Sequence, residues 1–228
     1  MEILIQSFTR AIRSLSAPGM IKVFVLSVAL TLFTLILFIF VVGGVANYFL
    51  SGTEYWVLAW LATLGGTVIS WLLFPGIMPI IVNFFDVKIA GLIEQQNYPA
   101  ATPLANPPFW PELLHDARFS LFVVLANILV LPLYLIPVIN VVLFYWLNGY
   151  LLGREFFIMT ARRHMPIPEA RALWQTRSRT ITIAGMGLAL MATIPLINLV
   201  APFWGIAVMT HIFHGLKGTP KTQILPPI

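Results

Sequence analysis

Two nearly identical pentapeptides, IPVIN at residues 136–140 and IPLIN at residues 194–198, decide the fold that this sequence predicts. Each lies near the middle of a long segment, 119–153 or 180–216, that contains no Asp, Glu, Lys or Arg. Proline removes a backbone hydrogen-bond donor and clashes with the preceding helical turn, so neither segment is expected to form one straight helix. Because the two copies occupy the same place in their segments, an internal repeat is favoured over coincidence.

The basic residues indicate how these segments are placed in a membrane. Six arginines lie between positions 154 and 179. If each broken segment crossed the bilayer once, these arginines would lie on the opposite face from Arg10, Arg13 and Lys22, against the positive-inside bias. If each segment instead enters and leaves on the same side, every Lys and Arg lies on one face. The sequence therefore predicts two membrane hairpins, over 119–153 and 180–216.

The length of the hairpin arms predicts how deeply they enter the bilayer. Arms of about 13 to 18 residues would reach about 20–27 Å, which is less than the roughly 30 Å of the hydrocarbon core. We therefore expect half-penetrating hairpins, with tips that contain Pro137 and Asn140 in the first and Pro195 and Asn198 in the second. Two short full crossings in each hairpin remain an alternative if the bilayer thins locally.

The composition excludes most soluble classes of protein. Of 228 residues, 59% are hydrophobic and only 9% are charged, against roughly 25% charged in an average soluble domain. So few charges cannot cover the surface of a water-soluble globule, which excludes a soluble enzyme, a disordered chain and a nucleic-acid-binding domain. The net charge of +5 is better explained by membrane topology than by nucleic acid. The chain has no cysteine, which excludes disulfides and cysteine-ligated metals.

Two further charge-free runs stand on either side of Glu54. A membrane crossing needs about 20 apolar helical residues, so we expect transmembrane helices over 22–50 and 55–85. The first run is too long for a secretory signal peptide, whose apolar core has roughly 7–15 residues. Together with the hairpins, these helices predict a single all-α integral membrane domain over residues 1–228.

The remaining segments complete the expected topology. We expect an interfacial helix at 1–17, a cytoplasmic loop at 86–118, a basic cytoplasmic segment at 154–179 and a tail at 217–228. Both termini and the basic loops are then expected on the cytoplasmic side of a bacterial inner membrane. The interfacial helix would present one apolar face, formed by Leu4, Phe8, Ile12 and Leu15.

The sequence offers no convincing catalytic or metal-binding set. His211 and His214 would share a helical face, but no third ligand stands near them in the sequence, so an interfacial pair is the simpler interpretation. His115 and Asp116 resemble part of a proton relay, yet no serine motif accompanies them, which favours a solvated loop pair. We therefore expect no enzymatic activity, no cofactor and no metal.

The segment SAPGMIK at residues 16–22 is a candidate anion site. Proline presets the first turn of a helix, and the free amides and dipole of a helix start attract anions. The amides of Gly19, Met20 and Ile21 and the ammonium group of Lys22 are therefore candidate ligands. From these residues alone, a plain interfacial turn with a snorkelling lysine is the simpler interpretation.

Taken together, the motifs resemble those of the CysZ sulfate permeases, within the wider superfamily that includes the eukaryotic etoposide-induced proteins. The resemblance covers nearly the whole chain and rests on the order and spacing of several motifs. These are the Pro-Gly turn at 18–19, AGLIE at 90–94, the two Ile-Pro-x-Ile-Asn strings, PIPEAR at 166–171 and RSR at 177–179. The resemblance implies an inner-membrane homo-oligomer with two long transmembrane helices and two half-penetrating hairpins, which takes up sulfate for cysteine synthesis.

In that family, the turn after the Pro-Gly is implied to bind sulfate through backbone amides and two adjacent arginines, where this sequence has Ile21 and Lys22. Losing the bidentate guanidinium fork predicts weaker binding. The first hypothesis is a permease or channel for sulfate or a related oxyanion, with a pathway past Arg118, Arg154 and Glu155. The alternative is a non-transport membrane-shaping or scaffold protein, which the sparse intramembrane charge and Ile21 favour.

Overall fold

The computed structural model describes most of the chain, in segments that are separated by short gaps. These are residues 2–16, 18–50, 57–58, 60–61, 64–69, 77, 81–82, 84–104, 109–130, 132–133, 136–198 and 200–217. The described residues form helices and turns and contain no strand, in agreement with the predicted all-α class. The chain divides into two compact units, one of residues 19–85 and the other of residues 1–18 and 86–228.

The smaller unit contains α2, which runs from Met20 to Leu50. At 31 residues the helix is about 47 Å long, and its stretch Met20–Val45 is apolar and long enough to cross a membrane. The hydroxyl groups of Ser27, Thr31 and Thr34 each donate to the carbonyl four residues earlier, at 2.9, 2.7 and 2.9 Å. Such internal pairing is what polar side chains need in lipid, where no water can satisfy them.

The second transmembrane helix, expected over 55–85, falls largely outside the described residues. The longest described piece of it is helical and spans 64–69. A Cβ atom added at Gly66 would lie 3.2 Å from a methyl group of Val42 on α2, so glycine permits close packing inside this unit.

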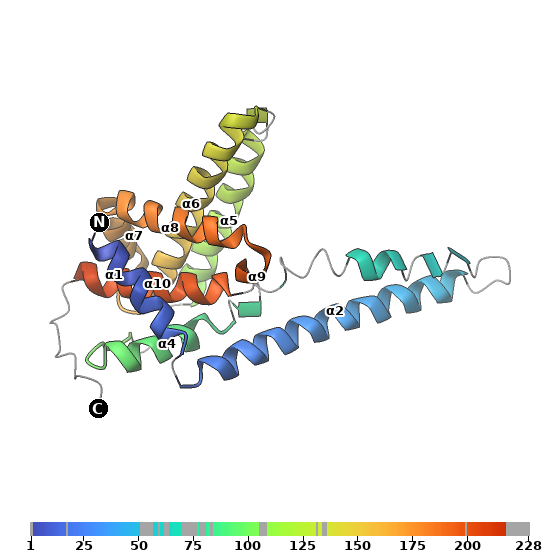
Figure 1. Ribbon diagram of the computed structural model, residues 1–228, viewed down its shortest axis with the longest axis horizontal. Coiled ribbons are helices and arrows are strands. Elements are labelled where there is room, and N and C mark those ends of the chain that lie inside the picture. The colour runs from blue at the N-terminus through green and yellow to red at the C-terminus, as the bar shows by residue number, and fades with distance from the viewer. Residues whose placement is uncertain are drawn as a thin grey trace. The chain divides into compact units, whose positions relative to one another are not determined.

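The larger unit contains the two predicted hairpins (Figure 1). In the first hairpin, α5 (Phe109–Val130) and α6 (Pro137–Ala161) lie side by side and antiparallel. In the second, α8 (Ser178–Ala192) turns through the short α9 (Pro195–Asn198) and folds back onto α10 (Ala201–Lys217). The break in each predicted segment therefore lies at its proline, as expected from the missing backbone donor.

The repeat extends to the backbone of the two hairpin turns. Each proline opens the helix that follows the turn. In both turns the amide of the Asn donates to the carbonyl of the Ile four residues earlier, at 2.8 Å, from Asn140 to Ile136 and from Asn198 to Ile194. The copies differ afterwards, because α6 continues unbroken for 25 residues whereas α9 ends after one turn.

The helices of the second hairpin have the expected 13 to 18 residues, whereas those of the first are longer. Helices α5 and α6 have 22 and 25 residues, or about 33 and 38 Å, because both continue past the charged ends of the apolar segment. Helix α8 has 15 residues and is about 23 Å long, which is shorter than the hydrocarbon core of roughly 30 Å. The apolar part of α5, Leu121–Val130, is also short, and the half-penetrating arrangement of both hairpins stays a prediction.

Glycines bring the two hairpins together along α6 and α8. A Cβ atom added at Gly149 would lie 2.8 Å from the backbone nitrogen of Met186, and one at Gly153 would lie 2.6 Å from the carbonyl oxygen of Ile181. A Cβ atom at Gly185 would overlap the carbonyl oxygen of Gly149. The Gly-xxx-Gly spacing on α6 thus allows the two backbones to touch, as small residues do in membrane helix pairs.

Helix α10 forms the centre of this unit, with α1, α4, α6 and α8 packed around it. Helix α1 (Glu2–Ser14) forms as expected, but it packs on α10 through a face of mostly small residues: Leu4, Ser7, Ala11 and Ser14. Ile12, expected on the apolar face, is 55% exposed. Leu4 of the expected apolar face is buried and Phe8 and Leu15 are half-buried, so Ile12 alone lies away from the packed side.

The segment expected as a loop at 86–118 is mostly helical. It contains α4 (Asp86–Asn97), a non-helical stretch at 98–104 and the first turns of α5. Pro111 lies in the first turn of α5, where proline is tolerated because the amides there have no intrahelical partner. The backbone at His115 and Asp116 is therefore part of a helix, and the expected loop pair was wrong.

Candidate functional site

The predicted anion site at the start of α2 has the expected backbone shape. Gly19 has a φ of 87°, a conformation that favours glycine, and α2 begins at the next residue. The amide of Val23 donates to the carbonyl of Gly19 at 3.1 Å, which leaves the amides of Met20 and Ile21 without an intrahelical acceptor. Ile21 is 67% exposed and Lys22 is exposed. The helix start is thus present, with a single cation beside it.

The structure brings two of the three pathway candidates to one cavity of about 400 Å³ in the larger unit. Three helices contribute its walls. Its lining residues are Arg118 and Phe122 of α5, Tyr150 and Arg154 of α6, and Arg171, Trp174 and Gln175 of α7 (Ile167–Thr176). We call this the arginine cavity. It has room for roughly a dozen water molecules at about 30 Å³ each, so a hydrated oxyanion fits.

Aromatic contacts hold the walls of the arginine cavity in place. The guanidinium carbon of Arg154 lies 5.6 Å from the centre of the Trp174 ring, within range of a cation–π interaction. The ring of Tyr150 meets Trp174 edge-on at 5.5 Å and Phe122 at 6.4 Å. The ring of Trp174, held by Tyr150, therefore orients the guanidinium group of Arg154.

The electrostatics of the arginine cavity favour an anion. Three guanidinium groups line it, and none of its described lining residues is acidic. Among the described residues, the buried Nε of Arg171 and the buried indole Nε1 of Trp174 have no hydrogen-bond acceptor. A buried donor without an acceptor costs about 1–3 kcal/mol, and guanidinium groups bind tetrahedral oxyanions through two parallel hydrogen bonds. The lining of the arginine cavity therefore favours an anion by its charge.

Glu155, the third pathway candidate, does not line the arginine cavity. It follows Arg154 directly on α6, and successive helical residues point about 100° apart. The structure therefore places Arg118 and Arg154 at one cavity and Glu155 outside it, and a pathway past these residues stays a prediction. Arg171 and Trp174 were not named as candidates, because no spacing in the sequence predicts that α7 lies beside α5 and α6.

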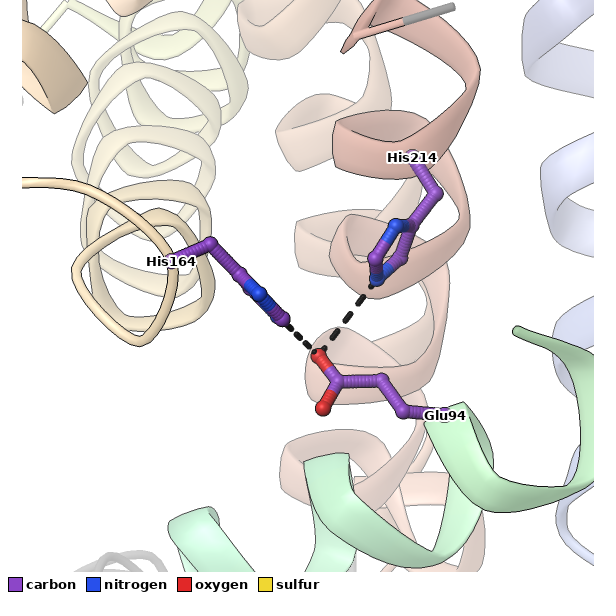
Figure 2. Close-up of side chains that lie close together, drawn as sticks. All are labelled: Glu94, His164 and His214. Atoms are coloured by element: carbon purple, nitrogen blue, oxygen red, sulfur yellow. Dashed lines mark hydrogen bonds and ion pairs between the residues drawn. The ribbon is translucent and has the colours of Figure 1, made fainter. Parts of the chain in front are cut away.

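A second polar site lies around Glu94 on α4 (Figure 2). Oxygen Oε1 of this carboxylate is 2.6 Å from Nε2 of His164 and 3.4 Å from Nε2 of His214. Its other oxygen accepts a hydrogen bond from Nη2 of Arg163 at 2.9 Å. We call Glu94, Arg163, His164 and His214 the Glu94 cluster. It joins α4, the turn after α6 and the end of α10.

The carboxylate of Glu94 is ionised in this setting. Burial on its own would raise the pKa of Glu94, but hydrogen bonds from His164, His214 and Arg163 and the charge of Arg163 outweigh that effect. The pKa is therefore held well below its usual value. The motif AGLIE, quoted for the family resemblance, thus supplies the centre of the cluster.

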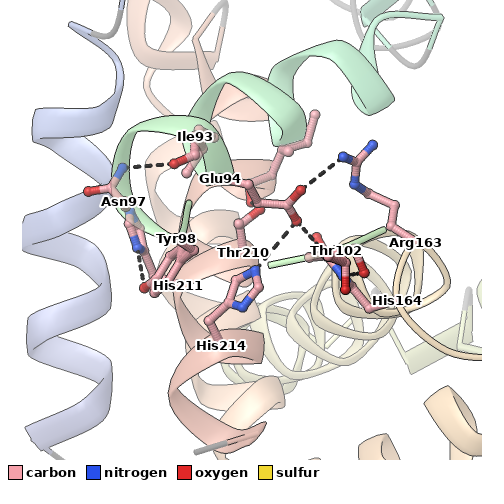
Figure 3. Close-up of polar contacts among 12 residues, drawn as sticks. Ile93, Glu94, Asn97, Tyr98, Thr102, Arg163, His164, Thr210, His211 and His214 are labelled. Atoms are coloured by element: carbon pink, nitrogen blue, oxygen red, sulfur yellow. Dashed lines mark hydrogen bonds and ion pairs between the residues drawn. The ribbon is translucent and has the colours of Figure 1, made fainter. Parts of the chain in front are cut away.

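The two histidines expected as an interfacial pair are instead buried, at 2% exposure for His211 and 3% for His214. They also face different partners (Figure 3). His211 lies 2.9 Å from the hydroxyl of Ser14 and 2.8 Å from that of Tyr98, whereas His214 faces Glu94. The expectation was wrong because the partners stand far away in the sequence.

An all-helical chain with an apolar, membrane-length helix and an arginine-lined cavity is typical of a membrane protein that handles anions. The family model for "Sulfate transporter CysZ/Etoposide-induced protein 2.4" matches residues 7–202. The chain belongs to this family, which confirms the resemblance seen in its motifs. The description of the family names a sulfate transporter. No curated protein and no solved structure matches the chain.

Proposed function

We propose that this protein is a permease or channel for sulfate or a related oxyanion, and that the anion binds in the arginine cavity on its way across the membrane. The observation that carries this proposal is the set of donors there: three guanidinium groups and a buried indole N–H, without an acid among the described lining residues. The family supports sulfate as the substrate class. Uptake would supply sulfur for cysteine biosynthesis.

The start of α2 is proposed as a second, weaker binding place. The free amides after Gly19 and the ammonium group of Lys22 can hold an anion there. The two-arginine fork implied by the family is absent, so this place lacks bidentate contacts. The arginine cavity offers the guanidinium groups that the helix start lacks.

Flux through purified protein tests the function. Proteoliposomes should accumulate labelled sulfate faster than empty liposomes, and Arg171→Gln should slow this uptake. Arg177→Gln is the matched control, since Arg177 is an exposed arginine that does not line the arginine cavity. Sulfate entry equal to that of empty liposomes would favour the scaffold alternative, which the long exposed apolar face of α2 also suits.

We further propose a homo-oligomer in a bacterial inner membrane, with both termini and the basic segments cytoplasmic. The chain has no cysteine, so single cysteines can be labelled without background. A cysteine at the exposed Thr176, after the first hairpin, should be unreachable from outside intact cells and should react in inverted vesicles. Labelling of Thr176→Cys from outside would contradict the hairpin topology.

A further inference from the structure

The Glu94 cluster brings together three side chains of the kind that bind transition metals. One ligand atom each from Glu94, His164 and His214 lie within 4.8 Å of one another. These atoms belong to side chains that are 5%, 4% and 3% exposed. Two imidazoles and one carboxylate are a ligand set known for Zn²⁺ sites that keep a fourth position open.

Two of the three spacings among these atoms can be compared with those of a zinc site. Zinc binds imidazole nitrogen and carboxylate oxygen at about 2.0–2.2 Å in tetrahedral geometry, which places neighbouring ligand atoms about 3.3 Å apart. The distance from Glu94 to His214 is 3.4 Å and that from Glu94 to His164 is 2.6 Å. A small outward shift of His164 would create room for the ion.

The hydrogen bonds of His164 orient it as a ligand. Its Nδ1 lies 3.3 Å from the carbonyl oxygen of Thr102, which can accept a hydrogen bond from the Nδ1–H tautomer. In that tautomer, Nε2 directs its lone pair towards the carboxylate oxygen of Glu94, 2.6 Å away. A proton or a metal ion between these two atoms would satisfy both.

The surroundings supply the outer contacts of a metal site. Arg163 binds the oxygen of Glu94 that faces away from the imidazoles, and it also donates to the carbonyl of Val87 at 2.8 Å. The ring of His214 stacks on Tyr98 at 4.1 Å. Such outer partners fix the orientation of metal ligands and tune their affinity.

We propose that Glu94, His164 and His214 bind one divalent transition-metal ion of the Zn²⁺ class, with water or an anion in the fourth position. The ion would connect α4, the turn after α6 and α10, three segments far apart in the sequence. This site is separate from the arginine cavity, and the proposal does not depend on the transport function.

The test uses the full-length protein in detergent, purified with a tag that lacks histidine and stripped with a chelator. Zn²⁺ should bind at one equivalent per chain, and Co²⁺ should give the intense visible bands of a four-coordinate ion. His164→Gln and His214→Gln should each weaken Zn²⁺ binding by more than about 100-fold, because loss of an outer partner alone costs roughly 10–100-fold. At free Zn²⁺ of about 100 times Kd, the Tm should rise by about 5–10 °C.

His211→Gln is the matched control, since His211 is buried on the same helix and its hydrogen bonds go to Ser14 and Tyr98, not to Glu94. This variant should keep Zn²⁺ affinity and the Co²⁺ bands. The proposal is overturned if the wild-type protein binds no Zn²⁺ and gives only the weak Co²⁺ bands of a six-coordinate ion. It is also overturned if His211→Gln weakens binding as much as His214→Gln. If the variants do not fold, the Co²⁺ spectrum of the wild-type protein still tests the proposed metal site.

Discussion

The Glu94 cluster and the arginine cavity, both in the larger unit, hold charge in opposite ways. In the Glu94 cluster, one carboxylate is met by two imidazoles and a guanidinium group. In the arginine cavity, three guanidinium groups line one space, and none of the described lining residues is acidic. The first region is built around an anion of the protein itself, whereas the described lining of the second contributes cationic and aromatic groups. Arginines of the same basic segment therefore take part in two different kinds of site.

Removing the internal anion should give the largest effect on stability. Glu94→Gln leaves the guanidinium group of Arg163 without its counter-charge, and breaking a buried ion pair costs about 3–5 kcal/mol. Thermal unfolding in detergent with a chelator should show a large fall in Tm. Glu169→Gln, at an exposed position on α7, is the control and should unfold as the wild type does. An unchanged Tm for Glu94→Gln would show that the Glu94 cluster does not hold the fold together.

Removing a cation from the arginine cavity should affect binding instead of stability. Arg171→Gln should weaken sulfate binding by roughly 10- to 100-fold, the equivalent of one hydrogen bond to a charged group. Its Tm should not fall, because it also lowers the repulsion among three like charges. Equilibrium binding of labelled sulfate measures the affinity, and thermal unfolding measures the stability. A lower Tm with unchanged sulfate binding would contradict a binding role for Arg171 and would indicate a structural role.

Helix α6 carries Arg154 and leads into His164, so its packing on α8 supports both regions. Gly149→Ala should lower the free energy of unfolding by about 1–3 kcal/mol, because the new methyl group would meet the backbone of Met186. Gly44→Ala on α2 has no atom within 4 Å of the added Cβ and is the matched control. Equal effects of the two substitutions on unfolding would contradict the close contact between hairpins.

The smallest effect is expected at the start of α2. Lys22→Ala should weaken sulfate binding by about two- to fivefold, because an exposed charge is screened by water. Ile21→Arg should strengthen binding, because it supplies a guanidinium fork beside the free amides. Binding isotherms of both variants check this, and weaker binding by Ile21→Arg would exclude an anion from this turn.

Features that depend on the local chain could be predicted from the sequence. Pro137 and Pro195 interrupt their helical segments whatever the tertiary structure is. Proline lacks a backbone donor and its ring clashes with the preceding turn, and both effects are local. The same holds for the turn at Gly19, where the backbone conformation favours glycine. These positions predicted the hairpin turns and the start of α2.

Features that depend on distant partners could not be predicted. Glu94 contacts His164 and His214, which lie 70 and 120 positions later in the chain, and no pattern in the sequence predicts these contacts. The arginine cavity likewise needs the crossing of three helices. One signal was readable and was not used: the Gly-xxx-Gly spacing of Gly149 and Gly153, which marks a close helix contact.

The most direct test of the central claim is to locate the anion. Crystals of the protein soaked in selenate, whose selenium scatters anomalously, should show a peak between Arg154, Arg171 and Trp174. The peak should disappear in Arg171→Gln and persist in Arg177→Gln. Anomalous density elsewhere on the molecule, with none beside these residues, would contradict the assignment of the arginine cavity as the place where the oxyanion binds.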